Sequence, residues 1–326
     1  MNKLTLRAVA RTLKKPQSTL IFCHQNPDPD TLGSAFALKH ILEHFGSSVT
    51  VACCDNASRK FDFITEGVSL TESFDIDSFQ RVVAIDTGSE KQLGSYSWFS
   101  DRVTLIIDHH EMNNRFCDYY EDLAPATAMI VYDIARSLRI LKKLPLHFFT
   151  CVYAGLSGDT GCFKYSNTTE KALVYASRLV KTGINFSEIN RMIFDCKTVG
   201  EISAQRMVYD NMELLLDGRL AFVYVSNKLK SKYKISQDDI SDIVNTIRQI
   251  QGVLVAVSVK QSDSDECRFS VSSRANADID VSELCARLGG GGHTRAAGAT
   301  IENSSESDVL ENVKTIFSQG VLNYGN

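Results

Sequence analysis

The chain has 326 residues, and its 35 basic and 39 acidic side chains give it a formal net charge of −4. At roughly 100–200 residues per domain this length predicts about two domains, and the composition is that of an ordinary globular protein. The negative charge argues against a broad basic surface for long duplex DNA, whereas short anionic ligands need only a few local cations. The apolar runs are too short to span a membrane and the polar, basic first residues do not form a signal peptide, so a cytoplasmic protein is expected.

The nine cysteines are scattered along the chain, and no two of them have the C-x-x-C spacing. This pattern does not support a structural zinc site or a thioredoxin-type motif. An odd number of cysteines without a secretion signal fits a reducing compartment. Most of these thiols are therefore expected to be buried or idle.

The first half of the chain alternates short apolar runs with amphipathic segments. Strands are predicted at residues 20–23, 49–53, 81–85 and 103–107, and helices at residues 31–45 and 126–138. Apolar residues recur at helical spacing in both helices, and Gly46 follows the first helix as a C-terminal glycine does. Strand, loop and helix repeating in this way predict an α/β fold with a parallel sheet covered on both faces. In such sheets the ligands bind outside the carboxyl ends of the strands.

A second, smaller α/β unit is predicted from about residue 205 onward. Its strands are expected at residues 220–225, 253–259 and 268–273, the last two as antiparallel neighbours, and its helices at residues 238–250 and 281–288. Four glycines and His293 follow the last of these helices. Alternating lysines occur at positions 228, 230, 232 and 234. A solvated loop is expected there, and guidance of a short RNA is the alternative.

Four groups of acidic and imidazole side chains lie at or near predicted strand ends. The groups are His24, Asp28 and Asp30; Asp86; Asp108, His109 and His110; and Asp159. Three of them follow predicted strands, and the fourth follows the apolar-containing stretch 148–156, so all are expected at one edge of the sheet. Any one of these aspartates alone would more often be a cap or a turn residue, and the inference depends on their occurring together.

Carboxylates with a few imidazoles suit Mn²⁺ or Mg²⁺ better than a structural zinc ion. Two such ions about 3.5–4 Å apart would activate a water molecule and hold phosphoryl oxygens. Pro27 and Pro29 stiffen the loop after the first strand, and the helix expected near residue 31 points its N-terminus at the same place, which suits a phosphate. The sequence therefore predicts a metal-dependent site that cleaves phosphoesters.

The motifs H-x-N-P-D-x-D, A-I-D, D-H-H-x-x-N and D-T-G occur in this order, which resembles the DHH phosphoesterase superfamily. Residues 290–293, Gly-Gly-Gly-His, resemble the DHHA1 domain of that superfamily. A stand-alone chain of this length resembles the group of bifunctional oligoribonucleases (nanoRNases) and pAp phosphatases. The resemblance implies a DHH domain over residues 1–187, a connector over 188–204 and a DHHA1 domain over 205–326, with the active site in the cleft between the domains.

The resemblance also implies two metal ions, Mn²⁺ or alternatively Mg²⁺, and assigns their ligands. His24 and Asp28 would bind the first ion, Asp86 would bridge both ions, and Asp30, His109 and Asp159 would complete the shell of the second. Asp108 would orient the histidines. His110 would face the substrate, where it stabilises developing charge or protonates the leaving oxygen.

The substrate contacts implied by the resemblance lie mostly in the second half of the chain. They are Asn113, Arg274, Gly291, Gly292, His293 and Arg295. Glycines without a Cβ let backbone amides form an anion-binding nest, and an arginine fork holds a phosphate through two hydrogen bonds. Arg274 matches the substrate-binding arginine of the family, whereas Arg295 stands where the family often has another residue type.

The activity implied by the resemblance is hydrolysis of short oligoribonucleotides to mononucleotides and dephosphorylation of 3′-phosphoadenosine-5′-phosphate (pAp). The expected partners are short RNA and nucleotide phosphates, with no long duplex DNA and no membrane, and a homodimer is slightly favoured. Two enzymatic alternatives stay open, a phosphodiesterase for cyclic-di-AMP or pApA and an exopolyphosphatase-like hydrolase. A non-catalytic nucleotide-binding regulator is the alternative from another class.

Overall fold

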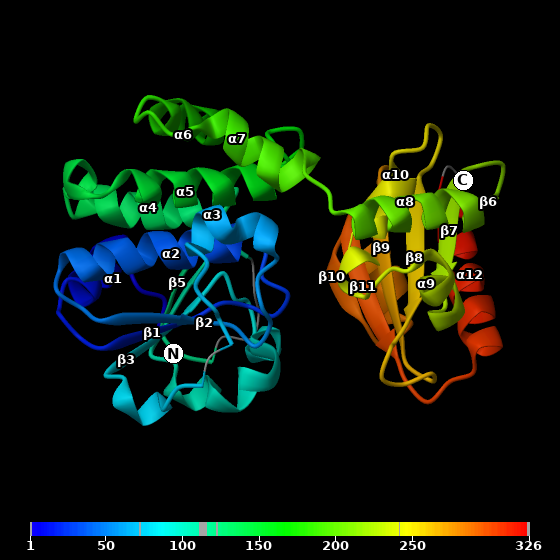
Figure 1. Cartoon of the computed structure of the whole chain (residues 1–326), viewed down its shortest axis with the longest axis horizontal. Coiled ribbons are helices and arrows are strands. Elements are labelled where there is room, and N and C mark those ends of the chain that lie inside the picture. Colours follow the sequence, from blue (N-terminus) through cyan, green and yellow to red (C-terminus); the bar gives the residue numbers. More distant parts are fainter. Residues whose placement is uncertain (1, 72, 111–115, 122, 241, 325–326) are drawn as a thin grey trace. The chain divides into compact units, whose positions relative to one another are not determined.

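The computed structural model describes residues 2–71, 73–110, 116–121, 123–240 and 242–324 (Figure 1). The chain forms two compact units, Met1–Cys196 and Lys197–Asn326. Each unit has its own sheet and its own hydrophobic core. None of the helices in the described part of the chain has the length and apolar character that a bilayer crossing requires.

The sheet of the first unit has five strands, all parallel, in the order β2-β1-β3-β4-β5. The strands are β1 (Thr19–Phe22), β2 (Val49–Ala52), β3 (Arg81–Ile85), β4 (Leu105–Asp108) and β5 (Tyr119–Glu121). The predicted parallel α/β sheet is therefore confirmed. Because β1 pairs with β2 on one side and β3 on the other, the strand order reverses beside β1. In sheets of this kind, ligands bind outside the carboxyl ends of the strands at such a reversal.

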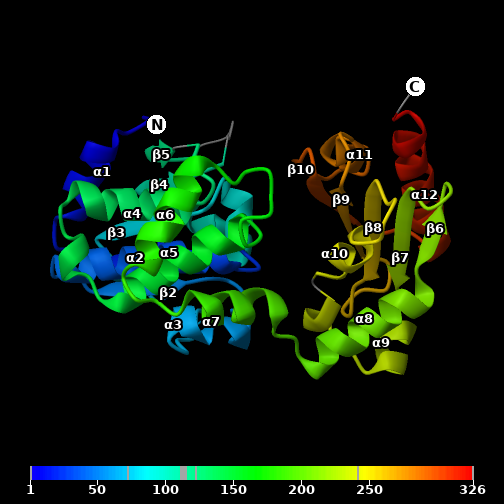
Figure 2. The ribbon, with the colours of Figure 1, turned by 90° about the horizontal axis from the view of Figure 1, so that it is seen from above.

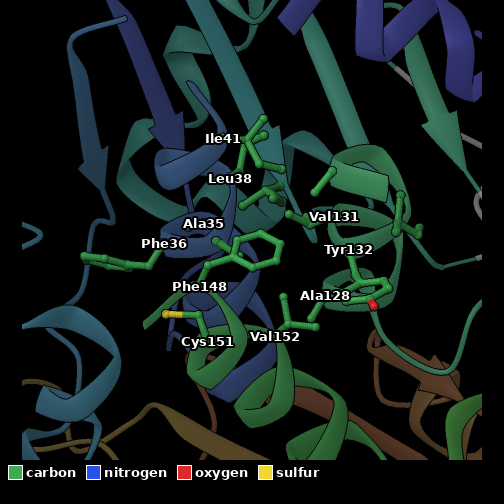
Figure 3. Close-up of a cluster of buried hydrophobic side chains, with 14 of the residues drawn as sticks. Ala35, Phe36, Leu38, Ile41, Ala128, Val131, Tyr132, Phe148, Cys151 and Val152 are labelled. Carbon is green, nitrogen blue, oxygen red and sulfur yellow. The ribbon is translucent and has the colours of Figure 1, made fainter. Parts of the chain in front are cut away.

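Helices cover one face of this sheet in layers (Figure 1). They are α1 (Leu6–Leu13), α2 (Pro29–His44), α4 (Thr127–Ser137), α5 (Leu146–Asp159), α6 (Glu170–Val180) and α7 (Phe186–Asn190). α2 and α4 contact the strands, α5 packs against both of these helices, and α6 and α7 contact α5. Figure 3 shows the core between α2, α4 and α5, where Leu38 of α2, Val131 of α4 and Phe148 of α5 lie side by side.

The opposite face of the first sheet is covered mainly by short 3₁₀ segments and loops. The short elements of the first unit are the 3₁₀ segments Arg59–Phe61, Ile76–Ser78, Glu90–Arg102 and Leu141–Lys143, α3 (Asp62–Thr65) and a π-helical turn at Arg191–Asp195. Phe22 of β1 packs there against Phe74, Tyr96 and Phe99, with ring centroids 5.5–6.3 Å apart. Both faces are thus covered, but only one of them by α-helices.

The second unit is a six-stranded mixed sheet with helices on both faces. Its strands are β6 (Glu213–Leu215), β7 (Leu220–Val225), β8 (Val255–Gln261), β9 (Phe269–Ala275), β10 (Gly291–His293) and β11 (Ala296–Ile301). Their order is β10-β11-β9-β8-β7-β6, and β8 and β9 are antiparallel neighbours as predicted. The helices are α8 (Val199–Asn211), α9 (Asn227–Tyr233), α10 (Ile243–Arg248), α11 (Val281–Ala286) and α12 (Glu306–Leu322). In Figure 2, α11 and α12 lie on one side of the sheet, and α8 and α9 lie on the other.

Three local predictions are wrong for identifiable reasons. The expected helix over residues 238–250 is broken into a 3₁₀ turn, Asp238–Ile240, and α10. The stretch 148–156 is part of α5, so Asp159 follows no strand and instead ends a helix. The lysine run lies partly on α9, where Lys230 is only 4% exposed rather than solvated. Apolar runs of this length occur in buried helices as well as in strands, which explains the error at α5.

Candidate metal centre

The loop after β1 brings His24 and Asp28 to the edge of the first sheet. Asp28 is the N-cap of α2, and its Oδ1 accepts hydrogen bonds from the amides of Asp30 (2.9 Å) and Thr31 (3.0 Å). Pro29 fits the first turn because proline lacks an N–H group that a helix start leaves unpaired. The helix therefore begins at Pro29, two residues before the predicted start. His24 Nε2 lies 3.7 Å from Asp28 Oδ1.

Asp86 follows β3 directly and occupies the centre of the group. It is 2% exposed, and its carboxylate oxygens lie 3.6 Å from His24 Nε2 and 3.6 Å from His109 Nε2. Its φ of 53° is left-handed, a backbone conformation that is strained for most residues with a side chain and that clusters at functional sites. The amide of Asp86 donates to Ile107 O (2.9 Å), so pairing with β4 holds this conformation.

Asp108 is the last residue of β4 and is fully buried. Its Oδ1 accepts hydrogen bonds from the backbone amides of His109 (2.8 Å) and His110 (3.2 Å) and from His110 Nδ1 (2.8 Å). His109 turns the other way, and its Nε2 lies 3.2 Å from Asp159 Oδ2. Asp108 therefore anchors the His110 imidazole while His109 faces the carboxylates.

Asp30 and Asp159 reach the same place from two crossing helices. The buried Asp30 carboxylate accepts hydrogen bonds from the amides of Thr127 (2.6 Å) and Ala128 (3.0 Å) at the start of α4. α5 can pass this carboxylate closely because it has a glycine there: a Cβ on Gly155 would lie 2.6 Å from Asp30 Oδ1. A Cβ on Gly33 of α2 would likewise lie 2.4 Å from the Cys151 carbonyl oxygen of α5.

The side chains form three overlapping groups whose ligand atoms lie within 4.8 Å of one another. The groups are His24, Asp28 and Asp86; Asp30, His109 and Asp159; and Asp86, His109 and His110. Nδ1 of His24 lies 2.8 Å from Gln25 O, and Nδ1 of His109 lies 3.0 Å from Ala124 O. A carbonyl only accepts, so each Nδ1 donates its proton to the carbonyl and each Nε2 is the nitrogen that faces the carboxylates and can bind a cation. This set of carboxylate and imidazole donors fits a divalent metal ion.

Crowding of the carboxylates changes their acidity. Burial and the charges of Asp86 and Asp28 raise the pKa of Asp30 well above its usual value. Burial and the neighbouring carboxylates, Asp30 first among them, likewise raise the pKa of Asp159. Burial lowers the pKa of His110, but the hydrogen bond to Asp108 and the charges of the surrounding carboxylates together outweigh it and raise that pKa to about 9. A bound divalent cation would offset this repulsion between buried like charges.

The structure thus brings together eight of the nine predicted site residues of the first unit. Asn113 lies outside the described residues. Thr127 was not predicted, although it donates from its hydroxyl to Asp86 Oδ1 (2.8 Å) and from its amide to Asp30. The available signal was its position at the start of the predicted helix 126–138, because the first amides of a helix attract carboxylates.

The predicted substrate residues of the second unit lie on β9, on β10 and in the turn that follows β10, and β11 separates these two strands in the sheet. Arg274 is on β9, and Gly291, Gly292 and His293 form β10, which is exposed and pairs with β11. A Cβ on Gly292 would lie 2.7 Å from Ala296 O, so close strand packing also explains a glycine there. Arg295 bonds to Asn276 O (3.3 Å) and lies 3.6 Å from Asp278 Oδ1.

Comparison with known families gives two matches along the chain. Residues 18–156 match the DHH family, N-terminal domain, and residues 217–319 match the DHHA1 domain. The chain is 26% identical over 315 residues to the probable bifunctional oligoribonuclease and PAP phosphatase NrnA of Streptococcus mutans, covering 95% of this chain and 98% of that protein. It is 25% identical over 315 residues to the bifunctional oligoribonuclease and PAP phosphatase NrnA of Bacillus subtilis, covering 95% and 97%.

Solved structures share the fold. An exopolyphosphatase-related protein from Bacteroides fragilis superposes with a TM-score of 0.86 at 19% identity, covering 98% of this chain and 96% of that one. RecJ from Thermus thermophilus, solved in complex with Mn²⁺, has a TM-score of 0.56 at 12% identity, covering 98% of this chain and 55% of RecJ. The two family matches fall one in each unit of the structure, and the chain therefore belongs to the DHH family, among the members that also carry a DHHA1 domain.

Proposed function

We propose that this protein is a metal-dependent phosphoesterase that hydrolyses short oligoribonucleotides to mononucleotides and removes the 3′-phosphate of pAp. The observation that carries the proposal is the pair of candidate ligand groups around His24 and His109, which meet at Asp86 where the strand order reverses. The full-length relatives named as oligoribonuclease and PAP phosphatase support the choice of substrates.

The two groups suit two divalent cations, Mn²⁺ or alternatively Mg²⁺. His24 and Asp28 would hold one cation, and Asp30, His109 and Asp159 the other, with Asp86 shared. Bound there, the cations would polarise a phosphoryl oxygen and lower the pKa of a water molecule. Asp86 is suited to the shared position because each of its two oxygens faces a different histidine, at 3.6 Å in both cases.

His110 and the second unit are assigned to the substrate. The Nδ1–H group of His110 is held by Asp108 at 2.8 Å, which leaves Nε2 as the ring nitrogen that can meet a phosphoryl or leaving oxygen. Arg274 and His293 are proposed to hold a phosphate of the bound nucleotide, since an arginine fork binds phosphate through two hydrogen bonds. Arg295 shares its guanidinium with Asn276 and Asp278, so a substrate role would require it to leave these contacts.

Product analysis of the purified full chain tests the function. The substrates are pAp, the dinucleotide pApA and a long RNA, each incubated with Mn²⁺ and with EDTA. We expect rapid, metal-dependent turnover of the first two and slow action on the long RNA. Comparable rates on the long RNA would instead indicate a processive exonuclease.

Variants separate an enzyme from a nucleotide-binding regulator. Asp86→Asn and Asp159→Asn should each reduce turnover at least about a hundredfold, because each removes a ligand from a group that has only three. Asp101→Asn makes the same chemical change at an exposed aspartate and serves as the control. Binding of pAp without metal-dependent turnover in the wild type would contradict the enzymatic proposal, and full activity of both site variants would contradict the ligand assignment.

A further inference from the structure

One face of the second unit's sheet carries polar side chains in register across its strands. Lys260 of β8 pairs with Ser270 of β9, which pairs with Thr300 of β11. Arg274 of β9 lies four residues from Ser270 on the same strand, and cross-strand partners and alternate residues share a face. Lys260 and Arg274 therefore lie on one face of the sheet, in rows about 14 Å apart at roughly 3.4 Å per residue.

The Lys260 side chain is mostly buried, and its ammonium has no ion-pair partner among the described residues. It is 8% exposed, and its ammonium makes no hydrogen bond or ion pair within the described ranges of the chain. Burial lowers the pKa of Lys260, and the nearby cations Arg274 and Lys230 lower it further against the opposing charge of Asp242. Mostly buried lysines are usually paired, so the unpaired ammonium of Lys260 is available to an anionic ligand.

The Lys260 side chain lines a surface cavity of about 390 Å³. Hydroxyl groups that can donate to an anion surround it, namely those of Ser262, Ser264, Ser270 and Thr300. The other charges of the wall already have partners: Asp263 binds Lys230, and Arg268 lies 3.4 Å from Glu302. Among the described charged residues that line the cavity, Lys260 is thus the one without an ion-pair partner.

We propose that this cavity, the Lys260 pocket, binds a phosphate group of the RNA substrate other than the phosphate that is cleaved. The inference rests on the proposed function and extends it to the length of RNA that the protein binds. A nucleotide held at Arg274 would have to extend about two rows of the sheet to reach Lys260. The pocket should therefore favour chains of several nucleotides over pAp.

Substrate-length kinetics test the pocket with Lys260→Met, which keeps the apolar stem and removes the charge. The KM for a pentaribonucleotide, divided by the KM for pAp, should rise about tenfold, the usual effect of losing a charge-assisted hydrogen bond, while kcat changes little. Lys260→Arg should restore most of the ratio. Lys232→Met removes an exposed lysine of α9 and is the matched control. An unchanged ratio in Lys260→Met would overturn the proposal.

Two further measurements separate an RNA-binding pocket from a structural lysine and from a site for a free anion. The melting temperature of Lys260→Met should equal or exceed that of the wild type, because the change breaks no ion pair and places an apolar side chain at a mostly buried position. A loss of several degrees would mean that Lys260 is structural and would overturn the proposal. Inorganic phosphate should raise the melting temperature of the wild type more than that of Lys260→Met. If that difference appears while the KM ratio stays unchanged, the pocket binds a free anion and not RNA.

Failure of the Lys260 pocket can be distinguished from failure of the proposed function by measuring RNA binding without turnover. A labelled pentaribonucleotide can be bound in EDTA, where no turnover is expected, and its Kd compared between the wild type and Lys260→Met. About tenfold weaker binding by the variant would support the pocket even if the wild type turned over no RNA in Mn²⁺. Equal binding would overturn the pocket even if the wild type were fully active.

Discussion

Thr127 supports the candidate metal centre from the first turn of α4. It is fully buried, its hydroxyl donates to Asp86 Oδ1 (2.8 Å) and its amide donates to Asp30 Oδ2 (2.6 Å). Loss of a partner of this kind typically costs 10–100-fold in metal affinity or activity. Thr127→Val should therefore reduce Mn²⁺-dependent hydrolysis of pAp at least about tenfold. Thr127→Ser keeps the hydroxyl and should stay near wild type, and equal activity of the two variants would contradict this role.

His40 makes folding stability depend on pH at a place away from the metal centre. His147 Nε2 lies 3.1 Å from Phe63 O, and His40 Nε2 lies 2.9 Å from His147 Nδ1. Since Phe63 O only accepts, His147 donates to it from Nε2 and accepts from His40 at Nδ1. Burial lowers the pKa of His40 from 6.5 to about 4, assisted by His147 and Lys39 and opposed by Glu66.

The sign of the pH effect follows from this lowered pKa. Between pH 6.5 and about pH 4 the unfolded chain binds a proton at His40 that the folded chain does not bind, so stability falls as the pH falls. His40→Asn removes this titration and should show a flatter dependence. The melting temperatures of both proteins, measured between about pH 7.5 and pH 4.5, should converge toward low pH. A constant difference would show that His40 does not cause the slope.

At the scale of elements, glycines allow α2 and α5 to pack closely where they cross. Alanine in place of a helical glycine normally stabilises by about 1 kcal/mol. At Gly155 the added Cβ would lie 2.6 Å from Asp30 Oδ1 and 2.7 Å from Ala128 Cβ, so overpacking outweighs that gain. Gly155→Ala should lower the free energy of unfolding by about 1–3 kcal/mol and displace Asp30. Denaturant unfolding and Mn²⁺ affinity measure both effects. Gly291→Ala, where no atom lies within 4 Å, is the stability control.

The strands beneath the metal centre are predictable because each is an apolar run that ends in a polar group. β1, β3 and β4 all lie within a residue or two of their predicted bounds. Since the carboxyl ends of parallel strands share one edge, the proximity of His24, Asp86 and His109 could be inferred without coordinates. Asp159 arrives at the same edge from the end of α5, and the pattern of apolar residues does not distinguish a buried helix from a strand over so short a stretch.

Contacts between elements are what the sequence does not reveal. The support that Thr127 gives to Asp86 spans 41 residues, and Lys260 of β8 is mostly buried near Lys230 of α9 and Asp242. Lys230 illustrates the limit: it belongs to an alternating basic run, yet its ammonium donates to Gln261 O (2.7 Å) and pairs with Asp263. Burial of a lysine requires tertiary neighbours that local sequence does not identify.

At the scale of the whole molecule, the two units have separate cores. We therefore expect a bound metal ion to stabilise only the unit that holds its ligands. The candidate ligands all belong to Met1–Cys196, and a ligand that binds only the folded state stabilises it by about 2.7 kcal/mol at a hundred times its Kd. For a unit of this size, that corresponds to a rise of about 5–11 °C in melting temperature. Calorimetry of the full chain should therefore show Mn²⁺ moving one transition and leaving the other in place.

Asp86→Asn gives a stricter test of this prediction. Whether the variant or the wild type is the less stable protein should depend on whether Mn²⁺ is present. Without metal, the variant replaces one of several crowded carboxylates with a neutral amide, and asparagine tolerates the left-handed φ of 53°. It should therefore be at least as stable as the wild type in EDTA. With Mn²⁺ it should be less stable, because the shared ligand of the two groups is lost. If Asp86→Asn is destabilised equally in both conditions, Asp86 has a structural role and the carboxylates are not arranged for a cation.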